Sequence, residues 1–390
     1  MIIKKIFKYL IFNFLKIFIN KKYKFYLHDF RFLGHLISFM YIKSFKSEFN
    51  KIIFMPGQLL EKKDPYINYK IFLYAYRSIY KKKISFLSNF IYYIFIKCNA
   101  NYKKDTKFRI DFLWRPNQIN KLSTVNKIFF DPKIKKKNNK KIENILKSKY
   151  ILFANRDMAF KNKMHPNKNF SHHDYRNEKL SSYESAIKKY NEYSNHEQFV
   201  RFGSIVEKNL KNKIIFNYPK SNFRSENNDL LLMKNCYFYT GTGSGPDILA
   251  LNYQRPIVYV NWLHLPNLFC YRGNIVVIFK KVLDLSTKKF IPYSKLMDPN
   301  FKKPFSDVPI GLYDNSAQFK KANLELMNNT HEEIFFPMKE MDLFLKKEFS
   351  FNLKLQSLFR KKFHKYTGKK VPNDFYISEY FIKKNKKLFL

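Results

Sequence analysis

Cysteine is scarce in this chain of 390 residues, and the three that occur, Cys98, Cys236 and Cys270, lie far apart. Their spacing matches neither a disulfide framework nor a metal site built on cysteine. The reducing cytoplasm is therefore the simplest compartment for the protein.

Acidic residues are also few: 30 Asp and Glu stand against 74 Lys and Arg, for a formal net charge of +44. Such an excess favours nucleic acid or an anionic membrane as a partner. The lysines are spread along the chain, however, and the composition is rich in Lys, Asn, Ile, Phe and Tyr, as an AT-rich genome would impose. No zinc-finger spacing, RNP-type aromatic strand or basic-zipper heptad accompanies the charge. We expect no nucleic-acid partner; the alternative is a non-catalytic basic protein that binds nucleic acid or anionic membrane surfaces.

Residues 1–25 contain no uncharged run long enough to cross a bilayer. Apolar side chains recur there at helical spacing, but lysines interrupt them, and the uncharged run 9–15 is too short to span. No small-residue cleavage site of a signal peptide follows. Two interpretations fit: a basic amphipathic helix lying peripherally on the anionic inner face of the cell membrane, or a basic first helix of the domain.

Strand and helix patterns alternate along the chain, which predicts an α/β fold with parallel sheets. Hydrophobic residues make up 45% of the chain and aromatic residues 19%, enough for two packed cores. Strands are expected at 25–30, 51–55, 150–154, 198–202, 214–218, 236–240, 257–260 and 274–279, and helices at 36–45, 68–83, 182–193, 227–234 and 246–251.

The charged, polar stretch 131–148 is expected to be a linker or an exposed helix, so the domain boundary falls there. The chain then divides into an N-terminal helix over 1–25, one domain over 26–145, a second over 146–325, and a mostly helical C-terminal segment over 326–390. In that last segment, Asn329-Thr330 is expected to cap a helix that starts near Glu332 and Glu333.

Glycine is rare, yet Gly241, Gly243 and Gly245 alternate within five residues. They separate the apolar stretch 236–240 from Pro246, which suits the first turn of a helix. This strand–turn–helix pattern leaves free N–H groups and a positive helix end at one point, which is typical of a phosphate site.

Three known motifs do not fit this turn. A Walker P-loop needs Lys after its last glycine, and no Lys follows Gly245. A nucleophile elbow needs glycine two positions either side of its serine, but Thr242 and Pro246 flank Ser244. The dinucleotide motif needs glycine at position 246. Two interpretations are left: a phosphate cradle of the Gly243 and Gly245 amides with the Thr242 and Ser244 hydroxyls, or a crossover turn without a ligand.

Polar residues follow two other predicted strands. Arg156 and Asp157 come after the strand at 150–154, and Arg201 and Gly203 end the strand at 198–202. Ligands of parallel sheets bind beyond the carboxyl ends of the strands. Arg156 is expected to bind a diphosphate through its forked guanidinium, which Asp157 would orient. The alternative is a surface Arg–Asp pair.

Histidines cluster in the loop 172–177, HHDYRN. Together with His165 their spacing matches no standard metal site, so we expect no metal. The preferred interpretation is that His173 lies beside Arg176 and near a sugar or a phosphate of the ligand. His35 follows Gly34 at a predicted helix start, where two roles fit it: a general base facing a cleft between two domains, or a structural histidine.

The order of these motifs resembles a known family. The matching residues are Gly34-His35-Leu36, Arg156-Asp157, His173 to Asn177, Val200 to Gly203, Gly241 to Pro246, Pro256 and Asn261-Trp262. In this order they resemble a bacterial family of glycosyltransferases encoded in surface-polysaccharide loci and, more distantly, the fucosyltransferase-like enzymes of GT-B fold. The resemblance covers about residues 30–340 and departs at 161–170.

The resemblance implies two facing Rossmann-like domains, with a nucleotide-sugar donor held mostly by the second, and hexosyl or deoxyhexosyl transfer to a surface-glycan or lipid-linked acceptor. It implies transfer without metal or added cofactor. Arg156 would bind the donor diphosphate, and the turn 241–245 would cradle its phosphates. Arg201 and Gly203 would line the nucleotide pocket, and His173 and Arg176 would face the sugar.

Overall fold

The computed structural model describes residues 24–27, 36–44, 52–55, 66–80, 128–134, 140–194, 198–268 and 273–389. His35 and all but the last two residues of the helix expected over 1–25 lie outside these ranges; those two residues belong to strand β1 (Lys24–Leu27). No helix within the described ranges is long and apolar enough to cross a bilayer.

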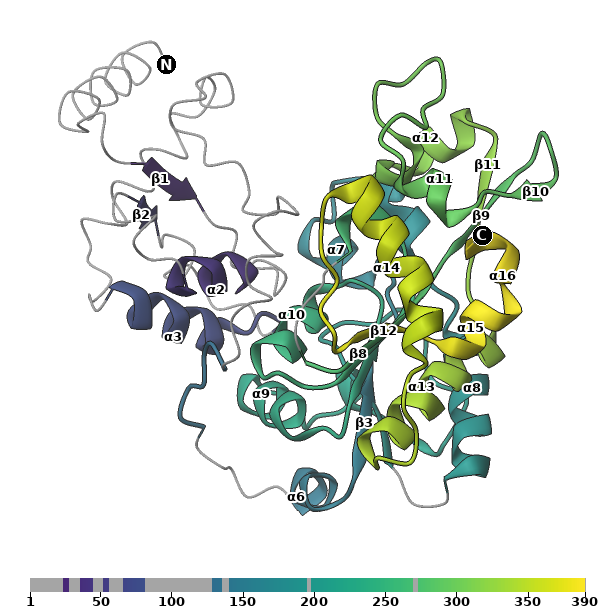
Figure 1. The fold of residues 1–390 in the computed structure, drawn as a ribbon. Helices are drawn as coiled ribbons and strands as arrows, with labels where there is room; N and C mark the ends of the chain where they lie inside the picture. Colours follow the sequence, from purple (N-terminus) through teal and green to yellow (C-terminus); the bar gives the residue numbers. More distant parts are fainter. Residues whose placement is uncertain are drawn as a thin grey trace, which may run out of the picture.

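A seven-stranded parallel sheet forms the centre of the molecule (Figure 1). Its strands run in the order β12-β8-β7-β6-β3-β4-β5, and every neighbouring pair is parallel. The expected α/β fold with a parallel sheet is thereby confirmed. The strands are β3 (Tyr150–Phe153), β4 (Gln198–Arg201), β5 (Ile215–Asn217), β6 (Tyr239–Gly241), β7 (Ile257–Trp262), β8 (Ile275–Phe279) and β12 (Phe375–Ile377).

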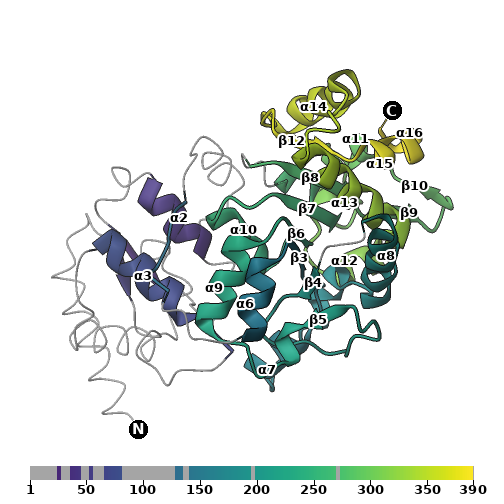
Figure 2. The same cartoon turned by 90° about the horizontal axis from the view of Figure 1, so that it is seen from below.

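Helices cover both faces of this sheet (Figure 2). The inner strands are buried along their whole length, which explains why they read as continuous apolar runs rather than alternating ones. One face carries α6 (Lys140–Lys147), α9 (Glu226–Asn235) and α10 (Gly245–Asn252), and the other carries α8 (Leu180–Tyr193) and α13 (His331–Leu345). The stretch expected as a linker or exposed helix thus contains α6, which buries Ile142 and Ile145.

The segment between β8 and α13 contains antiparallel strands that the sequence analysis did not predict. It pairs β9 (Lys281–Asp284) with β10 (Lys289–Phe290) and β11 (Leu324–Met327), and includes α11 (Tyr293–Met297) and α12 (Ser316–Lys321). These strands are short and carry charged residues, so neither a continuous apolar run nor a long alternation marks them.

The C-terminal segment is mostly helical, as expected, with α14 (Leu353–Thr367), α15 (Glu379–Lys384) and α16 (Lys386–Phe389) after α13. It also contributes the edge strand β12, whose three residues are too few to show a pattern. The expected cap is present: the Thr330 hydroxyl accepts from the Glu333 N–H at 3.2 Å, and the Glu333 carboxylate accepts from the Thr330 N–H at 3.0 Å.

The described N-terminal residues form a second, smaller unit in which β1 pairs in parallel with β2 (Ile52–Met55). Helix α2 (Leu36–Ser44) packs on α3 (Tyr69–Tyr80), with the rings of Phe39 and Phe72 at 6.1 Å. The start of α3 joins the larger unit through α9, because the Tyr69 N–H donates to the Glu226 carboxylate at 2.7 Å.

Gln356 of α14 completes the open edge of β12. Its buried amide donates to the Ile377 carbonyl at 2.7 Å and accepts from the Ile377 N–H at 2.9 Å. Gln356→Met retains the shape but leaves both backbone groups unpaired, so we expect a loss of about 1–3 kcal/mol in the free energy of unfolding, measured by urea denaturation. Gln198→Met, at an exposed position of β4, is the control and should leave the midpoint unchanged. Equal midpoints for the two variants would contradict this role of Gln356.

Candidate functional site

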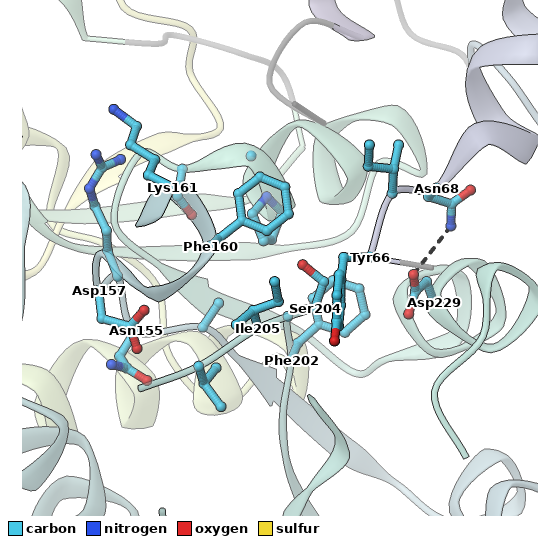
Figure 3. Close-up of a pocket in the computed structure, with 18 of the residues that line it drawn as sticks. Tyr66, Asn68, Asn155, Asp157, Phe160, Lys161, Phe202, Ser204, Ile205 and Asp229 are labelled. Carbon is cyan, nitrogen blue, oxygen red and sulfur yellow. Dashed lines mark hydrogen bonds between the residues drawn. The ribbon is translucent and has the colours of Figure 1, made fainter. Parts of the chain in front are cut away.

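The sheet has a topological switch point between β3 and β6. From β3 the chain continues to β4 and β5 on one side, whereas β6, β7 and β8 lie on the other. Open parallel sheets bind ligands in the crevice beyond the carboxyl ends of two such strands. A cavity of about 360 Å³ lies there, a size common for small-molecule sites (Figure 3).

Most of the predicted site residues meet in this cavity, which we call the anion cavity. Its walls include Arg156, Asp157, Arg176, Gly203, Gly243, Ser244 and Gly245. Arg201 and Thr242 are not among its lining residues, nor is His173. The structure therefore brings Arg156 and the glycine-rich turn together, although they are far apart in the sequence.

The turn after β6 needs its glycines for steric reasons. A Cβ at Gly241 would lie 2.3 Å from the Tyr239 hydroxyl and 2.7 Å from an Asp247 carboxylate oxygen. Gly243 has φ of +67°, in the left-handed region that favours glycine. Helix α10 then begins at Gly245, so the amides of Gly243 and Gly245 lie at its positive end, beside the anion cavity.

Ser244 differs from the expectation. Its N–H donates to one Asp247 oxygen at 2.6 Å and its hydroxyl donates to the other at 3.2 Å. Asp247 is fully buried, and burial raises its pKa to about 6. The Ser244 hydroxyl therefore uses its proton within the capping box of α10, which leaves the amides on either side as the donors for a ligand.

Four cations line the anion cavity: Arg224, which pairs with Asp229 at 3.2 Å, and Arg156, Lys161 and Arg176, which form no ion pair within the described residues. Burial, and next the charge of Arg176, lower the pKa of Arg156 to about 9, and its buried Nε has no hydrogen-bond partner among the described residues. Burial followed by the charges of Arg156 and Arg176 lowers the pKa of Lys161 to about 7. Each cation thus sits in the unfavourable field of the others.

Nearby carboxylates do not neutralise this charge. Asp157 and Asp229 line the cavity, but Asp157 pairs with Arg201 at 3.8 Å and Asp229 pairs with Arg224 at 3.2 Å. Burial raises the pKa of Glu178 and of Asp247, and Glu178 faces the buried Lys280. Within the described residues, Arg156, Lys161 and Arg176 therefore have no carboxylate as an ion-pair partner. An anionic ligand would supply the missing charge.

The loop that carries Arg176, the 3-10 helix η4 (Ser171–Arg176), is held at its C-terminal end by two cations. The Arg176 guanidinium donates to the Gly243 carbonyl, which ties the loop to the turn. The buried Lys280 ammonium donates to the carbonyls of Tyr175 at 2.9 Å and Asn177 at 3.3 Å. These bonds fix the distance between the loop and the end of β8, which positions Arg176 over the turn.

His173 lies among the cations rather than in the cavity wall. Its ring lies against that of His172, with centroids 4.0 Å apart and the planes tilted by 40°, and its buried Nδ1 has no partner among the described residues. Burial, followed by the charges of Lys161, His172 and the two arginines, lowers its pKa to about 3. The imidazole is therefore neutral at pH 7 and a weak base, and its place beside Arg156 and Arg176 agrees with a role next to a sugar or phosphate.

Arg201 and Asp157 also differ from their expected roles. Arg201 is fully buried; its Nε donates to Asn155 at 3.1 Å and its Nη1 to the Lys208 carbonyl at 2.6 Å. Asp157 accepts from the N–H groups of Ala159 and Glu207 at 3.0 Å each, and does not orient Arg156. Both residues shape the loops that form the floor of the cavity, including Gly203, whose φ is +146°.

The remaining walls are largely apolar. Phe160, Phe202, Ile205 and Val206 come from the larger unit, and Tyr66, Ile67, Asn68 and Phe72 come from the smaller one. Asn68 donates to Asp229 at 3.3 Å, as the dashed line in Figure 3 shows. The cavity therefore has a cationic end and an aromatic end, and segments from both halves of the chain enclose it.

Lys161, Glu178 and Lys280 were missed by the sequence analysis. Lys161 lies in the short helix α7 (Ala159–Met164), five positions after Arg156, and no motif distinguishes it from the other lysines of the chain. Lys280 is the residue directly after β8, so its place at a strand end was the one available signal.

Comparison with known proteins adds no assignment: no family model, curated protein or solved structure matches the chain. Within the described residues, no three His, Cys, Asp or Glu side chains gather as metal ligands. The family resemblance and the expectation of metal-independent chemistry both stay predictions.

Lys161 gives the site a testable pH dependence. Its pKa is about 7, and a bound anion would raise it, so anion affinity should be highest below pH 7 and fall as the pH rises above it. Burial also raises the pKa of Glu178, and loss of that proton acts in the same direction. Sulfate affinity, measured by calorimetry between about pH 6 and pH 9, should fall less steeply in Lys161→Met than in the wild type.

Lys163→Met is the matched control, since Lys163 is exposed on the same helix and does not line the cavity. It should retain the wild-type profile. Superimposable profiles for the wild type and Lys161→Met would show that Lys161 does not meet the anion.

Proposed function

We propose that the protein is a glycosyltransferase that moves a hexosyl or deoxyhexosyl group from a nucleotide-sugar donor to a surface-glycan or lipid-linked acceptor. One observation carries the proposal: Arg156, Lys161 and Arg176 converge with the amides of Gly243 and Gly245 on one cavity at the switch point of the sheet. The missing negative charge matches a diphosphate, and the adjoining aromatic wall matches a nucleotide base.

The mechanism follows from the charge distribution. During transfer, the bond between the anomeric carbon and the diphosphate oxygen breaks, and negative charge grows on that oxygen. Arg156 and Lys161 would stabilise this charge more in the transition state than in the bound donor, since both line the cavity before the reaction begins. The acceptor hydroxyl forms the new bond and gives up its proton to a base, a role for which His35 is the candidate that the sequence offers.

The proposed architecture is GT-B-like, with two facing Rossmann-like domains. Two features support it: β1 and β2 pair in parallel in the smaller unit, and residues 66–72 of that unit form one wall of the cavity. In this arrangement the smaller unit would present the acceptor. Peripheral contact with the anionic inner face of the membrane fits an acceptor anchored in lipid and the net charge of +44.

Arg156→Ala tests the proposal. Loss of the forked contact to phosphate should weaken nucleoside-diphosphate binding, and slow donor hydrolysis or transfer, by about a hundredfold or more. Arg156→Lys should restore part of the loss, because a single ammonium cannot reproduce the fork. The measurements are calorimetry with UDP and GDP, and product release from a panel of UDP- and GDP-sugars.

Arg77→Ala is the control for this variant. It removes the same charge from an exposed position of α3, and activity should stay within about twofold of the wild type. If both variants lost affinity equally, and that affinity collapsed with salt, binding would be non-specific. The protein would then be the basic nucleic-acid- or membrane-binding protein that its charge allows.

Chelation is a second test of the mechanism. If the cations of the chain supply the stabilisation, donor hydrolysis and transfer should keep their rates in EDTA after dialysis against it. A loss of activity that returns with added Mg²⁺ or Mn²⁺ would contradict the metal-independent mechanism.

A further inference from the structure

A second cavity, of about 240 Å³, adjoins the anion cavity. Arg176 and Gly243 line both, so the two share a wall at the turn after β6. The second cavity is smaller than the anion cavity. We call it the turn cavity.

The walls of the turn cavity combine one aromatic ring with neutral polar groups. Trp262 is the aromatic residue, and it lies close behind the turn: a Cβ at Gly243 would be 3.2 Å from its ring. Thr242 and Asn267 supply a hydroxyl and an amide whose side chains form no hydrogen bond within the described residues. Such groups can donate to and accept from the hydroxyls of a sugar.

Charge is nearly absent from these walls. Lys and carboxylate side chains do not occur among the described residues that line the turn cavity. His264 is half-buried, and desolvation followed by the charge of Arg176 lowers its pKa to about 3, so the imidazole is neutral at pH 7. Arg176 directs its guanidinium to the Gly243 carbonyl. The turn cavity thus contrasts with the cationic cavity beside it.

The backbone around Trp262 is strained, with φ of +51° at Asn261 and +64° at His264. Two bonds maintain the conformation of Asn261: its N–H donates to the Asn329 side chain at 2.6 Å, and its amide donates to Glu178 at 2.7 Å. Strain of this kind persists when neighbouring bonds over-determine it. Here it places Trp262 and His264 in the wall of the cavity.

We infer that the turn cavity binds the sugar of the donor, and that this sugar is an uncharged hexose or deoxyhexose. The inference rests on the proposed function. A nucleotide sugar with its diphosphate at Arg156 and Arg176 can place its next group past Gly243, in the turn cavity. Thr242 then contacts the sugar, whereas the sequence suggested that it contacts the phosphates. Asn267 becomes a residue that determines sugar specificity.

Binding of paired ligands tests the inference. Calorimetry compares UDP and GDP with their neutral hexose conjugates and with a uronic acid conjugate of UDP. For the accepted base, a neutral hexose should raise affinity over the bare diphosphate. Asn267→Ala and the isosteric Thr242→Val should each weaken binding of the hexose conjugate by about tenfold and leave the bare diphosphate within about twofold. Asn300→Ala, an exposed amide outside both cavities, should change neither.

The outcomes separate the two proposals. If the bare diphosphate binds but the hexose adds no affinity, or both variants weaken the two ligands equally, the turn cavity does not bind the sugar and the anion cavity still stands. A preference for the uronic acid conjugate would overturn the assignment of an uncharged sugar. If neither diphosphates nor conjugates bind the wild type, the proposed function fails and this inference fails with it. Retained diphosphate affinity in the variants also shows that they fold.

Discussion

The Glu178 carboxylate joins the elements that build the site. It accepts from the Arg156 N–H at 3.1 Å, from the Tyr183 hydroxyl at 2.9 Å and from the Asn261 amide at 2.7 Å, and it attracts Lys280 electrostatically. These donors come from the ends of β3 and β7, from α8 and from the residue after β8. One acidic side chain thus fixes several strand ends and loops relative to one another, including the segment that carries Arg156 into the anion cavity.

The cations that this framework holds repel one another. Arg156 and Lys161 are both shifted toward their neutral forms by burial and by neighbouring positive charge, which opposes folding to some extent. A protein retains such an arrangement where the surrounding bonds over-determine it, as the bonds of Arg176 to Gly243 and of Lys280 to two carbonyls do here. The same repulsion makes an incoming diphosphate favourable, because the anion relieves it. Ligand binding and the stability of the site are therefore linked.

Local patterns were sufficient to predict much of the sheet and the turn. The apolar runs at β3, β4, β7 and β8 are continuous because both faces of these strands are buried. The alternating glycines predicted a strand–turn–helix unit, because a Cβ at Gly241 would clash with Tyr239 and the positive φ of Gly243 favours glycine. Patterns failed for β9 to β11, whose residues are mostly exposed or half-buried, and for the edge strand β12. For these strands, pairing with a neighbour decides the conformation.

By itself, the sequence determined which residues end buried strands and where the backbone needs glycine, because both follow from contacts within about ten residues. It therefore placed Arg156 and the 241–245 turn at strand ends. Only the tertiary structure decided that β3 and β6 are neighbours, that Lys161 joins the cations, and that Arg201 and the Ser244 hydroxyl are used internally. Hydrogen bonds and burial between segments distant in the sequence decide these neighbours and partners. A linear pattern of residue types does not specify which partner each polar group will have.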